Sequence, residues 1–315
     1  MITDIVSVLF GLVLVAVTGD QFVIAAERLA ASLNLRPVVV GALIGGIGTG
    51  LPQLIVAAFA SSQGLAQIAV GSAVGSITVH IGLALAIAAL VSPIRVDSRT
   101  VRREAPLSVA SVALFALMVW QGLTTAAGVV LLLATAVAIV VLVMSARNAP
   151  QTEELAIEVE RVLEDEDAHD RRREIVRLVS SLIGMAVAAD PLVRGSEGVA
   201  RHLGISGGVV GLTMVAIGTS APLIASSIQA ARRGNHDLMM GNILGANLFI
   251  ALGNGVIVAF MSSTRGPGSL VPSLYVMVGM VLAGWAVARR LHTVTRWEAV
   301  SLLVVYAATL PLVVR

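Results

Sequence analysis

Two short segments of this chain place glycine, a hydroxyl side chain and proline in the middle of long apolar stretches. Residues 48–53 read Gly-Thr-Gly-Leu-Pro-Gln, and residues 218–223 read Gly-Thr-Ser-Ala-Pro-Leu. A proline inside a helix removes a backbone donor and frees a carbonyl oxygen one turn earlier. Such carbonyls, with the hydroxyls of Thr49, Thr219 and Ser220, are groups that bind a desolvated cation or a polar solute within a membrane. The alternative interpretation is a proline kink that serves only close helix packing.

The apolar stretch after each of these segments carries two glycines at a spacing of one helical turn. They are Gly71 and Gly75 in one stretch and Gly241 and Gly245 in the other. This spacing gives a helix a smooth face on which a second helix can pack closely. Ser76, Asn242 and Asn247 place polar atoms beside these faces. They could line a binding site or form hydrogen bonds between helices, and the sequence favours neither alternative.

The elements that must position these groups are membrane-spanning helices. Of the 315 residues, 57% are hydrophobic and 13% are charged, which is too apolar for a soluble fold. With about 20 residues needed per span, the chain has room for about ten helices. The expected spans cover residues 3–33, 37–63, 67–92, 104–122, 124–146, 174–203, 207–231, 237–262, 269–288 and 297–314. We therefore predict an all-α polytopic membrane protein, whose first apolar stretch is a span and not a cleaved signal peptide.

The two halves of the chain are related by an internal repeat. A repeat alignment that places Asp20 on Asp190 also places Glu27 on Glu197 and residues 47–52 on residues 217–222, without a gap. Because each repeat holds five spans, an odd number, the second copy must enter the membrane from the opposite side. The prediction is two inverted five-helix repeats, over residues 1–146 and 174–315, joined by a charged linker over residues 147–173. Inverted repeats are typical of transporters, although channels also contain them.

The positions of the arginines predict an orientation. All basic residues other than histidine are arginines, and the loop arginines gather between spans on one expected side, including the linker, with Arg265 as the clear exception. The positive-inside tendency places these loops in the cytoplasm and both termini outside, in a cell or inner membrane. The net charge of +2 gives no support to nucleic-acid binding. With no cysteine, no disulfide or thiolate metal site can form.

The paired Gly-Thr-x-x-Pro and Gly-x-x-x-Gly segments, with residues 234–242 leading into the second pair, resemble the two α-repeats of the cation/calcium exchanger superfamily. The resemblance covers nearly the whole chain. It implies ten helices, with ions bound midway between the second, third, seventh and eighth. It also implies alternating access by sliding of the first and sixth helices against the rest.

The chain departs from the family pattern where that pattern implies cation ligands. The glutamate that follows each proline in the family is Gln53 in the first repeat and Leu223 in the second. Two further positions that are polar in the family hold His80 and Ile250 in this chain. Two positions that hold serine in the family hold Gly50 and Ala246 here. A divalent cation prefers about six to eight oxygens, with carboxylates to offset its dehydration. We therefore expect the cation specificity to be altered or lost, with calcium exchange kept as an alternative.

The titratable side chains within the spans admit two interpretations each. His80 lies at membrane depth and could bind a proton beside Gln53, or it could be a neutral, hydrogen-bonded histidine of the bundle. The acidic residues Asp20, Glu27, Asp190 and Glu197 are expected to form structural ion pairs with Arg28, Arg194 or Arg201, and the alternative is that they coordinate an ion directly. No nucleophile triad, phosphate loop or zinc motif appears in the sequence, so an enzyme is not expected.

The sequence thus predicts a secondary transporter that moves a cation of the Ca²⁺, Na⁺ or H⁺ class by alternating access. The residues expected to line its cavity are Thr49, Gln53, Ser76, His80, Thr219, Ser220 and Asn247. The expected partners are the lipid bilayer and a small solute or ion, with no cofactor beyond the transported cation. The alternatives are a transporter of an organic or lipid-linked solute and a membrane scaffold that has lost transport.

Overall fold

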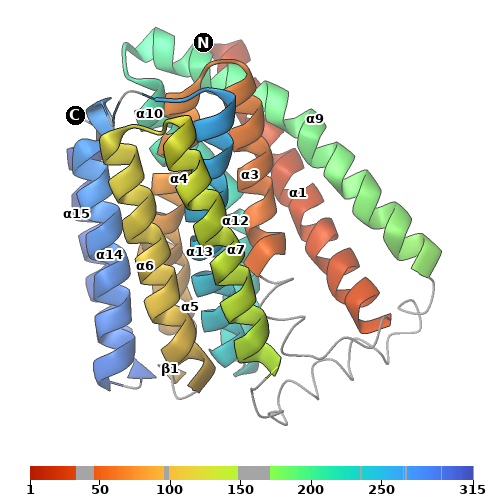
Figure 1. Ribbon diagram of the computed structural model, residues 1–315, viewed down its shortest axis with the longest axis vertical. Helices are drawn as coiled ribbons and strands as arrows, with labels where there is room; N and C mark the ends of the chain where they lie inside the picture. Colours follow the sequence, from red (N-terminus) through yellow and green to blue (C-terminus); the bar gives the residue numbers. More distant parts are fainter. Residues whose placement is uncertain are drawn as a thin grey trace.

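A computed structural model describes residues 1–32, 46–95, 99–147, 171–234, 236–264, 266, 268–291 and 293–314, and these residues are almost entirely helical (Figure 1). In the first half the helices are α1 (Ile2–Ser32), α3 (Gly46–Ser62), α4 (Ala66–Val79), the π-helical turn η2 (His80–Leu85), α5 (Ala86–Val91), α6 (Arg99–Gln121) and α7 (Thr125–Arg147). In the second half they are α9 (Arg171–Leu203), α10 (Gly207–Val210), the π-helical turn η4 (Gly211–Val215), α11 (Ala216–Thr219), α12 (Ala221–Arg233), α13 (His236–Met261), the 3₁₀ turn η5 (Gly268–Leu270), α14 (Val271–Leu291) and α15 (Arg296–Val314).

The helices match the spans that hydropathy predicts. Among the described residues, seven helices are long and apolar enough to cross a membrane, and the bent pair of residues 207–219 and 221–233 gives an eighth span. Helices α3 and α15 occupy the other two of the ten expected positions. Helix is expected here because a segment in lipid must satisfy its backbone hydrogen bonds internally. The prediction of an all-α polytopic membrane fold is confirmed.

Some predictions fall on residues outside the described ranges. The linker prediction over residues 147–173 lies mostly there, because residues 148–170 are not described, and Arg171 already begins α9. The start of the second expected span, residues 37–45, is also outside, as is the side chain of Glu27. Helix α6 begins at Arg99, earlier than the expected residue 104, because its first turn extends the apolar stretch with polar residues.

The repeat is visible in the backbone at two glycine turns. Gly64 lies in the turn after α3 and Gly234 ends α12, and the repeat alignment places one on the other. Both take the left-handed conformation, with φ of 75° and 78°, which glycine adopts without the steric cost of a Cβ atom. The repeat-equivalent helices α3 and α12 are thus each followed by a glycine in the left-handed conformation.

The glycine faces pack across the two halves. A Cβ atom on Gly46 of α3 would lie 3.1 Å from the backbone of Gly245 in α13. The repeat-equivalent contact is Gly75 of α4 on Ala216 of α11, where a Cβ would lie 2.6 Å from the alanine methyl. Backbones can approach this closely only where side chains are absent or small. The predicted packing role is confirmed for Gly71, Gly75 and Gly245, and this packing brings α3 against α13 and α11 against α4.

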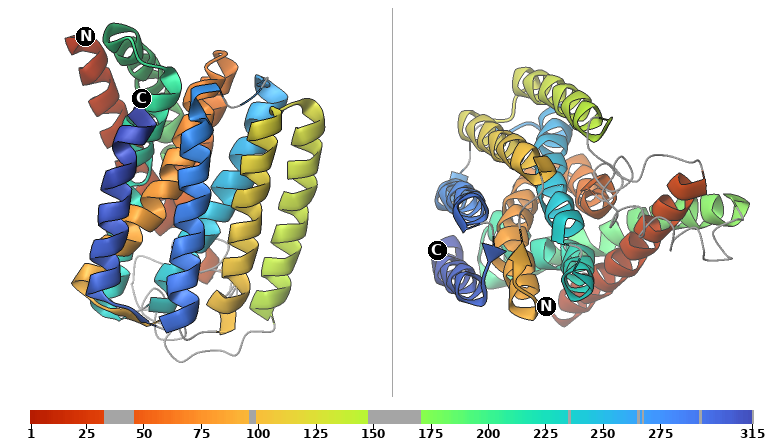
Figure 2. Two further views of the ribbon diagram at one scale, coloured as in Figure 1. Left: turned by 90° about the vertical axis from the view of Figure 1, so that its left-hand side faces the viewer. Right: turned by 90° about the horizontal axis from the view of Figure 1, so that it is seen from below.

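Two central helices and one peripheral pair define the layout. In the spans that contain α4 and α13, 78% of the most apolar window is buried, against 22% for α1 and 28% for α9. Both views show α1 and α9 side by side along one edge of the bundle (Figures 1 and 2). The proline-containing helices α3 and α12 therefore lie between the core and this helix pair, because Gly19 of α1 faces both Pro52 and Pro222.

A short antiparallel ladder links two loops of the two halves. Strand β1 (Ile94–Arg95) pairs with β2 (Thr293–Val294), with Ile94 opposite Val294. These loops follow the third and ninth expected spans, so the structure brings them to one face of the bundle. The sequence predicts the same side for both from their arginines, and which side faces the cytoplasm remains a prediction.

Candidate functional site

A buried glutamine lies at the centre of the contacts between the two halves. Gln53 of α3 is 1% exposed, and its Nε2 donates to Ser72 Oγ of α4 at 2.6 Å. The Ser72 hydroxyl itself donates to the Ala69 carbonyl at 2.9 Å, so it can only accept from Gln53. This arrangement assigns the orientation of the amide and directs its Oε1 atom to the opposite half of the protein.

The Gln53 Oε1 atom belongs to a cluster of four oxygens. It accepts from Thr219 Oγ1 at 2.6 Å and from Ser76 Oγ at 3.2 Å. The two hydroxyl oxygens lie 3.3 Å apart, and the Ala216 carbonyl oxygen is 3.4 Å from Ser76 Oγ and 3.3 Å from Thr219 Oγ1. Three helices supply these atoms: α3, α4 and α11. The cluster joins an amide, two hydroxyls and a backbone carbonyl, and none of the four carries a formal charge.

The breaks in the helices put these oxygens within reach of one another. Helix α11 stops at Thr219, Ser220 forms the cap, and α12 restarts at Ala221 with a bend of 44°. Pro222 stands in the first turn of α12, where its missing N–H costs nothing. Ser220 is 2% exposed, and its Oγ has no hydrogen-bond partner within the described part of the chain. Pro52, by contrast, lies inside the continuous helix α3.

His80 and Asn247 form a separate buried pair. The Nδ1 atom of His80 lies 2.7 Å from Asn247 Oδ1, and the side chains are 1% and 0% exposed. Because a carbonyl oxygen only accepts, this assignment puts a hydrogen on Nδ1 and leaves Nε2 as the basic atom. Asn247 Nδ2 is buried without a hydrogen-bond partner among the described residues. His80 also begins the π-helical turn η2, a distortion that is common at functional positions.

Thr49 contacts a third group of polar residues. Its Oγ1 donates to Asn242 Oδ1 at 3.1 Å, and Asn242 Nδ2 donates to Ser226 Oγ at 3.5 Å. The structure therefore brings Gln53, Ser76 and Thr219 into direct contact. It places His80 with Asn247 and Thr49 with Asn242, in neighbouring but separate pairs.

Three contributors were missed by the sequence prediction. Ser72 could have been found, because Ser72, Ser76 and His80 follow at intervals of one helical turn and share one helix face. The Ala216 carbonyl carries no side-chain signal. Asn254, two turns after Asn247, is fully buried and donates to the Ala69 carbonyl at 3.2 Å, while its Oδ1 meets no donor in the described ranges.

The second repeat has apolar, buried side chains at the positions equivalent to Gln53 and His80. Leu223, the repeat equivalent of Gln53, is 0% exposed, and Ile250, the equivalent of His80, is 1% exposed. A Cβ atom on Gly50 would lie 3.4 Å from the Ile250 side chain. Over the described part of the chain, no three histidine or acidic side chains gather as a metal site.

The acidic residues of α9 form the expected structural pairs. Asp190 bonds Arg194 at 2.6 Å, and Glu197 lies 4.0 Å from Arg201, each one turn along the same helix. Arg28 of α1, which was expected to pair within this acidic set, contacts Glu174 of α9 at 3.3 Å. These ion-pair contacts involve none of the four oxygens of the cluster.

The fold and the site define a polytopic membrane transporter built from two repeats. The sequence profile of the sodium/calcium exchanger protein family matches residues 3–144 and 174–314. The chain therefore belongs to the sodium/calcium exchanger family, whose members are transporters and not enzymes.

Individual relatives and a solved structure agree with this assignment. The candidate antiporter CaxA of Alkalimonas amylolytica is 34% identical over 308 residues, which cover 96% of this chain and 94% of that protein. The inner membrane protein YrbG of Escherichia coli (strain K12) is 34% identical over 266 residues, or 84% of this chain and 81% of that protein. The solved structure of the sodium-calcium exchanger NCX_Mj has a TM-score of 0.69 and 29% identity, covering 98% of both chains.

Proposed function

We propose that this family member is an alternating-access transporter whose central site carries a monovalent cation of the size of Na⁺, with Ca²⁺ no longer a substrate. The observation that carries the proposal is the cluster of four uncharged oxygens around Gln53 Oε1. The proposed ligands are Gln53 Oε1, Ser76 Oγ, Thr219 Oγ1 and the Ala216 carbonyl, with Ser220 Oγ beside them at the helix break. Thr49, His80 and Asn247 line the space around this cluster in the proposal.

Charge favours a monovalent ion. The cost of moving an ion from water into a medium of low dielectric constant grows with the square of its charge, so a divalent ion costs about four times as much. Carboxylates normally offset that cost for calcium. Here Gln53 is neutral, and Leu223 and Ile250 are apolar and buried. Hydroxyl, amide and carbonyl oxygens can replace part of the hydration shell of a single charge.

The spacing of the oxygens fits an ion of this size. Ligands at about 2.4 Å in octahedral directions lie about 3.4 Å from one another. The separations that involve Ser76 Oγ are 3.2, 3.3 and 3.4 Å. Gln53 Oε1 and Thr219 Oγ1 are closer, at 2.6 Å, because they share a hydrogen bond that an ion would replace. Na⁺ and Ca²⁺ have nearly the same radius, so charge and not size separates them at this cluster.

The names of the relatives are consistent with cation exchange. CaxA is named as a candidate antiporter, and NCX_Mj is named as a sodium-calcium exchanger studied in the presence of Na⁺. These activities belong to those proteins. They support cation transport here, while the loss of carboxylates supports a change of substrate.

A proton at His80 is the proposed counter-substrate. His80 lies one helical turn after Ser76, so the two side chains share a face at about 6 Å. Two positive charges at that distance repel by about 3 kcal/mol at an effective dielectric constant near 20, roughly a hundredfold in affinity. A protonated His80 would therefore expel the cation, and the bound cation would expel the proton. Such mutual exclusion is what an exchange cycle requires.

Purified protein in liposomes tests the proposal. We expect Na⁺ to raise the melting temperature in a saturable manner while Ca²⁺ does not, because a ligand of the folded state stabilises it. We also expect an outward proton gradient to drive ²²Na⁺ uptake. A saturable Ca²⁺ effect in the native protein would refute the proposal. No response to any cation would favour the alternatives, an uncharged solute against the apolar side chains of Leu223 and Ile250 or a scaffold without transport.

A further inference from the structure

Helices α1 and α9 contact one another along their whole length. A Cβ atom on Gly11 would lie 2.7 Å from Leu192 Cβ, and one on Gly184 would lie 2.5 Å from Thr18 Cγ2. Both figures of the whole molecule show the pair side by side at the edge of the bundle (Figures 1 and 2). None of the four oxygens of the cluster comes from either helix. A role of the pair in transport is therefore separate from cation binding at the proposed site.

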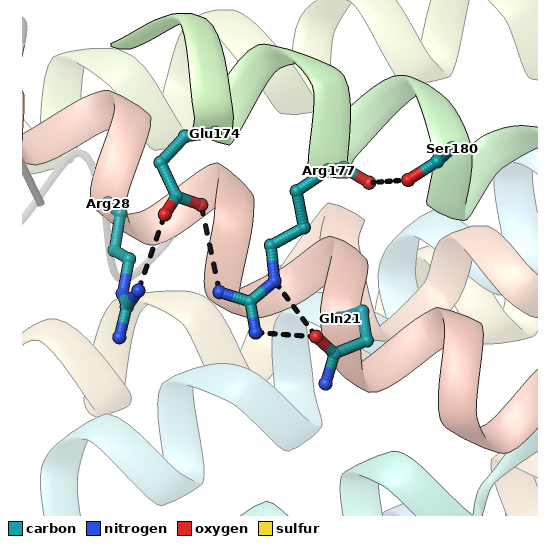
Figure 3. Close-up of polar contacts among 5 residues, drawn as sticks. All are labelled: Gln21, Arg28, Glu174, Arg177 and Ser180. Atoms are coloured by element: carbon teal, nitrogen blue, oxygen red, sulfur yellow. Dashed lines mark hydrogen bonds and ion pairs between the residues drawn. The ribbon is translucent and has the colours of Figure 1, made fainter. Parts of the chain in front are cut away.

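A buried carboxylate ties the pair together at one end (Figure 3). The side chain of Glu174, in the first turn of α9, is 1% exposed. One oxygen lies 3.3 Å from Arg28 Nη1 of α1, and the other lies 3.9 Å from Arg177 Nη1 of α9. Arg177 Nε in turn donates to Gln21 Oε1 of α1 at 2.8 Å. Two residues of each helix thus form one network.

The other end of the pair carries a contact of the repeat-equivalent acid with a different partner position. Asp4, at the start of α1, falls on Glu174 in the repeat alignment. It lies 3.4 Å from His202 Nδ1, near the end of α9, and this contact is an ion pair when His202 is protonated. At each end, an acid that begins one helix meets a base of the other helix.

The two ends differ in burial. The side chains of Asp4 and His202 are 27% and 50% exposed, and exposed pairs contribute little. Separating α1 from α9 at the other end would break the contacts of Glu174 with Arg28 and of Arg177 with Gln21, and removing one partner of a buried ion pair is strongly unfavourable. The buried network is therefore the stronger of the two polar contacts between the helix ends.

We infer that Glu174 is a positioning residue that holds α1 and α9 together as one moving body. The family resemblance implies that these helices slide, and the inference adds the group that joins them in this chain. Helix α1 presents Gly19 to both break prolines, where a Cβ would lie 2.9 Å from Pro52 Cγ and 3.5 Å from Pro222 Cγ. A joined pair thus moves past both α3 and α12 in a single step. The effect on transport rate rests on the proposed function.

Disulfide trapping tests whether α1 and α9 stay together, and it does not depend on which substrate is transported. The protein has no cysteine, so Thr18→Cys with Gly184→Cys gives a single reporter pair, whose Cβ atoms would lie 3.3 Å apart. We expect rapid oxidation in membranes, slowed several-fold by Glu174→Gln. The matched control is Asp190→Asn, which neutralises an acid of the same helix whose ion pair, with Arg194, lies within α9. An oxidation rate that Glu174→Gln leaves unchanged would overturn the inference.

Transport supplies the second readout. We expect Glu174→Gln to lower the maximal rate several-fold without a change in the Na⁺ concentration for half-maximal stabilisation. The trapped disulfide should restore that rate, and the charge swap Glu174→Arg with Arg28→Glu should restore it in part. A disulfide that blocks transport while Na⁺ still binds would overturn the inference, because the helices would then have to move apart. If Glu174→Gln slows oxidation of the cysteine pair but no cation stabilises the native protein, the role of Glu174 in holding α1 and α9 together is supported and the proposed function is refuted.

Discussion

Replacing Gln53 by leucine, the residue at the equivalent position of the other repeat, separates a binding role from a structural one. The change removes the hydrogen bonds of the amide with Ser72, Ser76 and Thr219. Each hydroxyl keeps an acceptor, because Ser72 also donates to the Ala69 carbonyl at 2.9 Å. Thr219 and Ser76 have the carbonyls of Val215 at 2.8 Å and Ala216 at 3.4 Å. No donor is stranded by Gln53→Leu.

The expected cost in stability is therefore small. Three bonds at a net value near the lower limit of about 0.5 kcal/mol each give a loss of about 1.5 kcal/mol. Loss of cation binding should lower the free energy of unfolding by more than this, since a ligand at a hundred times its Kd stabilises the folded state by about 2.7 kcal/mol. Without Na⁺ the variant should thus melt slightly below the native protein, and with saturating Na⁺ the gap should widen.

The assay is the melting temperature in detergent over a series of Na⁺ concentrations, with ²²Na⁺ uptake into liposomes. Thr78→Val is the matched control, because it removes a buried hydroxyl that donates within its own helix, to the Val74 carbonyl at 2.7 Å. It should keep the full Na⁺ response. A Na⁺ response that survives in Gln53→Leu would refute the assignment of Gln53 as a ligand. A loss of more than about 4 kcal/mol without Na⁺ would mark the residue as structural.

Three further changes probe the charge and the packing of the site. Gln53→Glu with Leu223→Glu should create a Ca²⁺-dependent rise in melting temperature, since two carboxylates offset the charge of a divalent ion. A folded variant whose melting temperature does not rise with Ca²⁺ would show that the loss of these two carboxylates does not by itself explain the loss of Ca²⁺ binding. In the native protein the apparent affinity for Na⁺ should fall as pH is lowered, because a proton on His80 repels the cation, and His80→Gln should flatten this dependence in the same titration. Gly75→Ala should lower the stability by about 2 kcal/mol or more, because its Cβ would lie 2.6 Å from the Ala216 methyl. The control Gly279→Ala, whose Cβ would have no described atom within 4 Å, should be neutral or slightly stabilising in the same melting assay.

The two halves of the site have diverged unequally. The first repeat supplies Gln53, Ser72, Ser76 and His80 to the centre, whereas the second supplies Leu223 and Ile250 at the positions equivalent to Gln53 and His80. Thr219 and the carbonyl of Ala216 are the second repeat's contributions to the oxygen cluster. The polar side chains of the first repeat at these two positions therefore have apolar counterparts in the second repeat, while each repeat supplies two of the four oxygens of the cluster.

The sequence by itself determined the helices, the repeat and the break at residues 218–223, whereas the interruption expected at residues 48–53 is a continuous helix in the structure. Hydropathy and proline position act through the local chain, so the expected spans agree within a few residues with α13 and with the span formed by α4, η2 and α5. The repeat alignment likewise needs no structure to be seen, because it places matching residue types on one another without a gap. The residue types of these segments predict that Gln53, Ser76 and Thr219 lie together, and the three side chains are in hydrogen-bond contact.

Only the tertiary structure decided which polar groups meet. Gln53 of one half faces Thr219 of the other, and His80 pairs with Asn247, not with Gln53. Arg28 binds Glu174, a residue that no pattern singled out. The physical reason is that glycine faces set which helices approach and at what depth, and a hydrogen bond depends on ångström-level distances between helices. Those distances are properties of the packed bundle, and no single segment of the sequence encodes them.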